Sequence, residues 1–292
     1  QKDKQMEIFR KMSFADSTGD AIPFYHEGKY HIFSLTSPPG TTVYPERLRT
    51  TWSHSISDDL VHWQELPTAL YPGEGDEPDA SGVWTGSVIY GEGQYHAFYT
   101  GYCLTAEFQQ TICHATSDDG ITWTKDIANP VITPMTELYE KLDWRDPYVF
   151  YNEEDENYWI LISARRLDMP VTRRGCIVLY RSKNLKDWTY YGPIYSPGHT
   201  NCPECPEMYK MGGHWYLSYS RFSEFVNTIY RVSESPFGPW RKPKKDGIGG
   251  RRFYAAKSMQ NDDGRRFYFG WAHDRACLLY TSPSPRDRQK SR

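Results

Sequence analysis

The sequence predicts an all-β fold: a five-bladed β-propeller with its active site in the central channel and an incomplete fifth blade. Two signatures recur along the 292 residues, a turn that ends in Trp and a hairpin of Gly and aromatic residues. The hairpin occurs five times, at intervals of about 50 to 65 residues, and repeats of this length built from short strands are typical of propellers. A sandwich of unrelated strands would not explain two signatures in register.

The hairpins supply a strand pair for each expected blade. Each combines alternating apolar and polar residues with a turn at Gly or Asn, as paired strands require. They cover residues 28–35, 93–101, 156–163, 213–220 and 264–271.

The turn signature precedes the expected outer strands. Its Ser and Asp side chains can hydrogen-bond their own backbone and close the turn, and the Trp then begins the next strand. The copies are SDDLVHW (57–63), SDDGITW (117–123), SKNLKDW (182–188) and a degraded SESPFGPW (233–240).

We divide the chain into an N-terminal segment (1–13), a catalytic propeller (14–276) and a tail (277–292). The tail reads CLLYTSPSPRDRQKSR and has no strand alternation. It resembles translated sequencing-adapter read-through, so we expect a disordered, non-native end and a natural sequence that differs after about Arg275. An interruption there would remove outer strands of the fifth blade and leave an exposed edge.

Composition excludes several classes of partner. The net charge is −3, so no basic surface indicates nucleic acid. No apolar run reaches membrane-spanning length, and QKDKQMEIFRKM lacks the apolar core of a signal peptide. We expect a monomer that binds neither nucleic acid nor membrane, and the compartment, extracellular or cytoplasmic, stays open.

Metal and cofactor sites are not expected. Cys202 and Cys205 form a single CxxC with no second half, so a zinc site is disfavoured against two small buried side chains. Aromatic residues make up 16% of the chain, which suits stacking on sugar faces, although core packing explains most of them equally well.

Three carboxylates recur at one phase of the repeat. Asp20, Asp146 and Glu204 each stand just ahead of a strand-turn-strand pattern. Equal phase means equal position in each blade, so we expect the three acids to converge on one axis. Such convergence is repulsive, and folds tolerate it mainly where chemistry needs an acid together with a nucleophile or base. Taken singly, each acid could instead be a turn cap or an ordinary ion pair.

Glycoside cleavage uses this set of groups. One carboxylic acid protonates the departing oxygen, and one carboxylate attacks the anomeric carbon or activates water. Glu204 lies among Cys and Pro residues, which suits a proton donor. Asp20 follows Gly19, which leaves room for close approach of a sugar. Asp146 follows Arg145, a built-in counter-charge.

Five segments resemble the catalytic propeller of glycoside hydrolase family 32, the invertases, inulinases, levanases and related β-fructosidases. They are WSHSISDDLVHWQELPTAL (52–70), GVWTGSVI (82–89), WRDPYVF (144–150), ECP (204–206) and RRFYAAKSMQNDDGRRFYFGW (251–271). The resemblance covers about residues 14–275.

The resemblance implies a retaining enzyme that cleaves terminal β-fructofuranosyl linkages of sucrose or of β-fructans of the levan or inulin type. It makes Asp20 the nucleophile, Asp146 the transition-state stabiliser, Glu204 the acid/base and Arg145 a ligand of sugar hydroxyls. The family's usual second domain is a C-terminal β-sandwich, which we do not expect within these residues. The first motif also departs from the family: WMNDPNG is replaced by STGDAIPF, which puts the fructose pocket in doubt.

Further substrate contacts are expected from two neighbouring segments. Trp52 and Trp84 are candidate platforms beside the sugar, and Thr85 and Ser87 are candidate hydroxyl ligands. Each could equally pack between blades or within a strand. His54 is more often structural than catalytic in such a place.

Two alternatives remain open. One is an inverting arabinan- or xylan-acting enzyme of the family 43 type, and the other is a non-catalytic carbohydrate-binding propeller. A carboxyl separation of about 5–5.5 Å between nucleophile and acid predicts retention, whereas about 6.5–9.5 Å predicts inversion.

Overall fold

The computed structural model describes residues 18–41, 43–222, 225–250 and 253–272. In these ranges the chain forms seventeen β-strands and two short 3-10 helices, Glu46–Leu48 and Val171–Arg173. The all-β prediction is therefore confirmed. No helix in the described ranges is long and apolar enough to cross a membrane. The segments predicted as a separate N-terminus (1–13) and as a tail (277–292) lie outside the described residues.

The strands pair antiparallel, in chain order, within five sheets. The first sheet contains β1 (Thr18–His26), β2 (Lys29–Thr36), β3 (Thr51–Ser57) and β4 (Gln64–Leu70). The second contains β5 (Gly82–Gly91), β6 (Gln94–Tyr102), β7 (Gln110–Ser117) and β8 (Thr124–Lys125). The third contains β9 (Tyr139–Asn152), β10 (Asn157–Arg166), β11 (Gly175–Ser182) and β12 (Thr189–Tyr195). The fourth contains β13 (Glu204–Met211), β14 (His214–Arg221) and β15 (Asn227–Ser233), and the last pairs β16 (Phe253–Gln260) with β17 (Arg266–Ala272).

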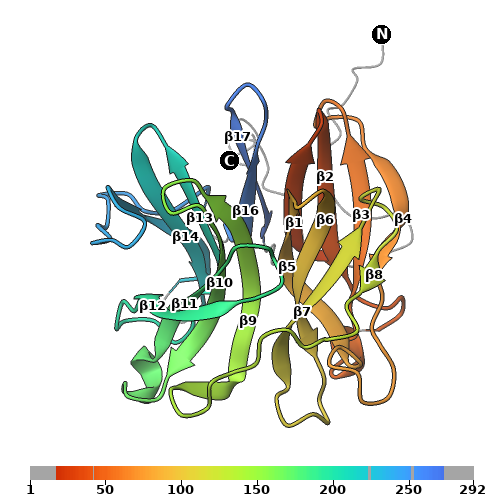
Figure 1. Cartoon of the computed structure of the whole chain (residues 1–292), viewed down its shortest axis with the longest axis horizontal. Coiled ribbons are helices and arrows are strands. Elements are labelled where there is room, and N and C mark those ends of the chain that lie inside the picture. The colour runs from red at the N-terminus through yellow and green to blue at the C-terminus, as the bar shows by residue number, and fades with distance from the viewer. Residues whose placement is uncertain (1–17, 42, 223–224, 251–252, 273–292) are drawn as a thin grey trace, which may run out of the picture.

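The first strands of the sheets form a closed ring. Each of β1, β5, β9, β13 and β16 contacts the next, and β16 contacts β1 in turn. Figure 1 shows the β16–β17 hairpin standing between the fourth sheet and the first. This arrangement is a β-propeller, as the sequence predicted.

The number of blades differs from the prediction. Four sheets have the three or four strands of a blade, so the described residues show four blades rather than five. At the fifth position the chain forms only the two-stranded hairpin. Residues 1–17 and 273–292 lie outside the described part of the chain.

The turn signature forms as predicted in its three intact copies. In the first, the Ser57 hydroxyl accepts hydrogen bonds from two backbone N–H groups, and Asp59 Oδ1 accepts from Val61 N and His62 N at 2.8 Å each. Equivalent bonds to the two side chains occur in the other copies, at Ser117 with Asp119 and at Ser182 with Asn184. The local sequence therefore closes these turns without tertiary help.

The apolar core lies between neighbouring sheets. Three large clusters fill the spaces between the first and second, second and third, and third and fourth sheets, and each contains a wholly buried Trp: Trp52, Trp144 or Trp159. A much smaller cluster, built around Cys205, Tyr254 and Ala255, packs the hairpin onto the ring. A large share of the aromatic residues thus serves packing between blades.

Every inner strand carries a β-bulge at the same point. The bulges begin after Thr18, Val83, Arg145, Glu204 and Tyr254, and in each case the inner strand has one residue more than its partner. A bulge bends a strand and re-aims its side chains. The five bulges form one layer of the ring, and the three predicted acids lie in that layer.

Candidate active site

The acids occupy three successive positions of the bulge. Counting from its first residue, Glu204 is first, Asp146 second and Asp20 third, in three different blades. The prediction that all three share one repeat position is therefore wrong by one or two residues. The prediction that they come together is confirmed by contacts that they share, because a bulge turns neighbouring side chains toward the same space.

Asp20 is held from three other sheets. The Thr85 hydroxyl on β5 donates to Oδ2 at 2.8 Å, and the indole N–H of Trp271 on β17 donates to Oδ1 at 2.9 Å. The Cys205 thiol on β13 lies 3.5 Å from Oδ2. The side chain is half-buried, so it stays open to a ligand while both its oxygens are fixed in direction.

Asp146 is the most enclosed of the three, at 5% exposure. Its φ is +58°, a left-handed conformation that Asp tolerates better than most residues. Its N–H donates to the Thr100 hydroxyl at 2.8 Å, and its Oδ2 accepts from Cys205 N at 2.9 Å. Burial raises the pKa of Asp146, the nearby charge of Arg145 lowers it, and the negative charge of Asp20 raises it.

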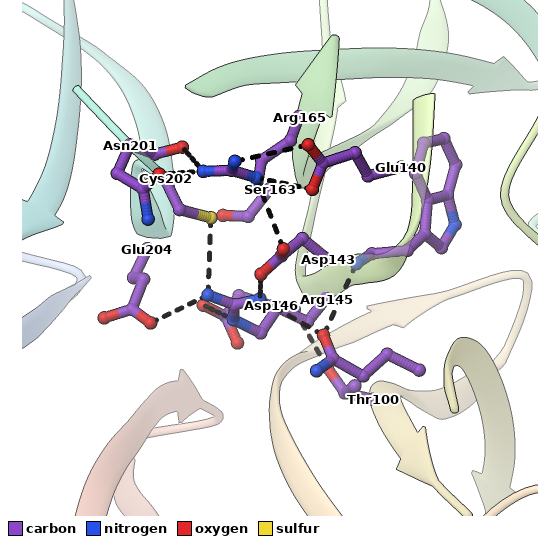
Figure 2. Close-up of polar contacts among 12 residues, drawn as sticks. Thr100, Glu140, Asp143, Arg145, Asp146, Ser163, Arg165, Asn201, Cys202 and Glu204 are labelled. Atoms are coloured by element: carbon purple, nitrogen blue, oxygen red, sulfur yellow. Dashed lines mark hydrogen bonds and ion pairs between the residues drawn. The ribbon is translucent and has the colours of Figure 1, made fainter. Parts of the chain in front are cut away.

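Glu204 lies between two donors. Arg145 Nη2 donates to Oε1 at 2.9 Å, and the Tyr254 hydroxyl donates to Oε2. Figure 2 shows Arg145 reaching from β9 toward Glu204 on β13. Both oxygens are therefore aimed by groups from neighbouring blades, as an acid/base that must hold one geometry requires.

Arg145 bonds mainly acids other than Asp146, although the sequence predicted that it would be the counter-charge of Asp146. Its Nη1 donates to Asp143 at 2.6 Å and its Nη2 to Glu204, whereas its Nε lies 4.0 Å from Asp146. The guanidinium also contacts Cys202 Sγ at 3.3 Å. It therefore fixes the acid/base and adds positive charge near Asp146 without a direct bond to it.

A second layer of charge holds this guanidinium in place. Arg165, buried to 5% exposure, lies 2.8 Å from Glu140 and 3.4 Å from Asp143, and Arg174 lies 2.6 Å from Glu140. Figure 2 places Arg165 and Glu140 next to Asp143, on the side of the network away from Glu204. Such a network of buried, bonded charges limits the positions that Arg145 can adopt.

The four predicted substrate contacts divide into two pairs. Thr85 bonds Asp20, and half-buried Trp84 precedes it in the same bulge, its ring stacked on Tyr102 at 4.0 Å between centroids. Trp52, in contrast, is wholly buried, and its N–H donates to Trp84 O at 2.9 Å. Trp52 is thus a core residue and not a sugar platform.

Ser87 and His54 also lie away from a substrate. The Ser87 hydroxyl donates to Pro147 O at 3.0 Å and accepts from Val149 N at 2.9 Å, so its bonding capacity serves the joint between β5 and β9. His54 is wholly buried, stacks on Phe33 and contacts His31, which makes it structural. The contacts of Ser87 therefore give its predicted role as a sugar ligand no support.

Sequence reasoning missed Tyr254, Trp271, Thr100 and the Cys205 backbone, all of which contact the acids. One signal could have found Tyr254, because it begins the fifth bulge at the position that Glu204 holds in the fourth. Thr100 carries no such signal. It is wholly buried and links Thr85 O to Asp146 N through its hydroxyl.

The CxxC pair does not share a ligand position. Cys202 Sγ faces Arg145 and Cys205 Sγ faces Asp20. In the described part of the chain, no group of three or more His, Cys, Asp or Glu side chains is arranged to hold a metal ion.

Comparisons with known proteins agree with this geometry. The family profile described as Glycosyl hydrolases family 32 N-terminal domain matches residues 21–277 and begins one residue after Asp20. A levanase of Bacillus subtilis is 31% identical over 277 residues, covering 85% of this chain and 38% of the relative. A sucrose-6-phosphate hydrolase of Escherichia coli is 29% identical, covering 89% of this chain and 54% of the relative.

Among solved structures, fructan 1-exohydrolase IIa from Cichorium intybus superposes with a TM-score of 0.74 at 23% identity, covering 91% of this chain and 54% of that one. This likeness shows a common fold. The chain spans about half the length of several curated relatives that it matches. Because the profile matches most of its residues, the chain belongs to glycoside hydrolase family 32.

Proposed function

We propose that this protein is a retaining glycoside hydrolase that cleaves terminal β-fructofuranosyl linkages of sucrose or of a β-fructan of the levan or inulin type. The observation that carries the proposal is the meeting of Asp20, Asp146 and Glu204 in one layer of bulges. Membership of family 32, whose matched relatives include a levanase and a sucrose-6-phosphate hydrolase, supports the choice of linkage.

In the first step, Glu204 gives its proton to the departing oxygen while a carboxylate oxygen of Asp20 bonds to the anomeric carbon. The bond from that carbon to the departing oxygen breaks, and a covalent fructosyl-enzyme forms. Thr85 and Trp271 hold the Asp20 carboxylate in direction, and Arg145 and Tyr254 do so for Glu204.

In the second step, Glu204 takes a proton from water, whose oxygen attacks the same carbon and releases Asp20. Both transition states carry positive charge on the sugar ring. Asp146, which is buried and contacts Cys205 as Asp20 does, stabilises that charge as a carboxylate. Thr85, whose hydroxyl bonds Asp20, orients the nucleophile, and half-buried Trp84 supplies an apolar surface next to it.

We also propose that the β16–β17 hairpin is the inner half of a fifth blade, within a monomeric catalytic propeller at about residues 14–276. The hairpin repeats the bulge of the other inner strands, lies in the ring between β13 and β1, and contributes Tyr254 and Trp271 to the acids. Residues 1–13 and the tail at 277–292 would then lie outside the catalytic unit.

The test is a panel of sugars with a stereochemical readout. Release of fructose from sucrose, inulin or levan, first observed as the β-anomer by NMR, supports the proposal. Release of arabinose or xylose from aryl glycosides with inversion would instead support the family 43 type of enzyme. Binding of the same sugars without turnover would overturn the catalytic assignment in favour of a binding propeller.

A further inference from the structure

Lys257 is a buried lysine inside the ring. It is 2% exposed and follows directly on the bulge of β16, at the position that Ala21, Gly86, Tyr148 and Glu207 hold in the other inner strands. Its Nζ donates to Gly86 O on β5 at 2.6 Å. A buried ammonium bonded to a neutral carbonyl still needs a nearby anion to offset its desolvation.

The carboxylate of its own layer already has a partner. Glu207 is wholly buried, and its Oε1 accepts from the backbone N–H of Ser258 at 3.0 Å and from the hydroxyl of the same residue. Arg266 Nη1 lies 3.6 Å from it, which gives Glu207 a counter-charge of its own.

The charged side chains of the second layer, which lies beside the three acids, also balance one another. Glu140 and Asp143 face Arg165 and Arg174, with contacts of 2.6 to 3.4 Å. Two negative groups thus meet two positive ones. No net charge from this set is left to compensate the three acids.

The three acids carry more negative charge than Arg145 alone can offset. Among the described residues, Arg145 lies 2.9 Å from Glu204 and 4.0 Å from Asp146, and Lys257 is the second cation whose charge acts on Asp146. Three carboxylates thus have two positive charges near them. Without Lys257 only one would remain, and a buried carboxylate that lacks a counter-charge binds a proton more readily.

We propose that Lys257 is a positioning residue of the active site, which ties the last hairpin to β5 and supplies a second positive charge beside Asp146. The tie reaches the nucleophile as well, because Gly86 directly follows Thr85, whose hydroxyl holds Asp20. The role in turnover rests on the proposed function, whereas the effect on the protonation of Asp146 does not.

Electrostatics point the same way as the geometry. Burial raises the pKa of Asp146 above its usual value, and the charges of Arg145 and Lys257 limit that rise. Lys257 acts electrostatically on Asp146 of β9 and on Cys205 and Glu207 of β13, and it lines one cavity together with Tyr25 of β1, Tyr148 of β9 and Arg266 of β17. Asp20 of β1 and Arg145 of β9 act on the same Asp146. β5 offers only the carbonyl of Gly86, since its sequence GVWTGSVIYG has no charged residue.

The experiment compares Lys257→Met with Lys257→Arg. The first removes the charge, and the second keeps it; a cavity of about 140 Å³ beside Lys257 leaves space for the larger guanidinium. Lys210→Met is the matched control, because Lys210 lies near the other end of β13, half-exposed and paired with Glu154 at 2.7 Å. Should Lys257→Met fail to fold, Lys257→Gln makes the same neutral test with a polar side chain.

Two measurements are made on each folded variant. The first is kcat/KM on a fructoside as a function of pH, and the second is the titration of Asp146 by NMR of carboxyl-labelled aspartate, assigned with Asp146→Asn. We expect Lys257→Met to move the acid limb and the Asp146 titration up by about one pH unit, and Lys257→Arg to restore both. Lys210→Met should leave both where they are in the wild type.

The outcomes separate the two proposals. If the wild type cleaves fructosides and both curves stay in place in Lys257→Met, the inference about Lys257 is overturned. If the wild type cleaves no fructoside but the Asp146 titration still moves, the proposed function fails and the electrostatic role of Lys257 stands.

Discussion

Replacing Arg145 by Met should cost more stability than any exposed charge in the molecule. The substitution removes a guanidinium whose side chain is 11% exposed and which bonds Asp143 at 2.6 Å and Glu204 at 2.9 Å. Each bond involves a charged donor and a charged acceptor, and such bonds contribute about 1.5–3 kcal/mol each. Asp143 keeps Arg165 and Glu204 keeps the Tyr254 hydroxyl, so the loss stays at about 3–5 kcal/mol, as for other broken buried pairs.

Equilibrium unfolding in urea, followed by tryptophan fluorescence, measures this loss directly. For a domain of this size, about 3–5 kcal/mol corresponds to a lower melting temperature by roughly 6–20 °C. The control is Arg241→Met, because Arg241 and Glu234 are 65% and 79% exposed and 3.4 Å apart. It should cost less than about 1 kcal/mol. If Arg145→Met loses no more than the control, the buried network does not hold the site together.

Three further predictions follow from individual groups. Glu204→Gln should lower kcat by about 10²- to 10⁴-fold with an unchanged circular dichroism spectrum, and normal turnover would remove it as the acid. Asp20→Asn should lower kcat by at least about 10⁴-fold, and mass spectrometry of a trapped wild-type intermediate should find the fructosyl group on Asp20; an adduct on another residue would refute the assignment. Burial lowers the pKa of His31 to about 4, of His54 to about 3 and of His96 to about 4, below the value near 6.5 of an unfolded chain. Stability should therefore be full above pH 6.5 and fall below it, by up to about 1.4 kcal/mol per histidine and pH unit, and a flat urea midpoint between pH 6.5 and 5 would contradict this.

The repeat pattern identified the three acids, but it did not predict the position of each acid within its bulge. In the sequence, the distance from acid to hairpin turn differs between the copies that contain Asp20, Asp146 and Glu204, and equal phase was the simplest interpretation. The structure shows that each acid instead takes a different step of one bulge. A bulge depends on pairing with the neighbouring strand, which a single strand does not encode.

The sequence also did not show which side chains of an inner strand point toward the acids. In VWTGSV, Thr85 and Ser87 lie two residues apart and looked equivalent as sugar ligands. The bulge falls between Val83 and Gly86, so Thr85 bonds Asp20 while Ser87 bonds the backbone of β9. Trp52 and Trp84 differ in the same way. Trp52 fills the space between blades, whereas Trp84 borders the acids.

The sequence by itself determined the repeating hairpins, the closed turns and the three acids, because these depend on alternation, on local side-chain bonds and on short motifs. It also identified Arg145, whose place beside the acids follows from its neighbour in the chain. Only the tertiary structure decided which groups surround the acids. Tyr254, Trp271 and Thr100 reach them from other parts of the ring, and their roles exist only once the ring closes and buries their hydrogen bonds together.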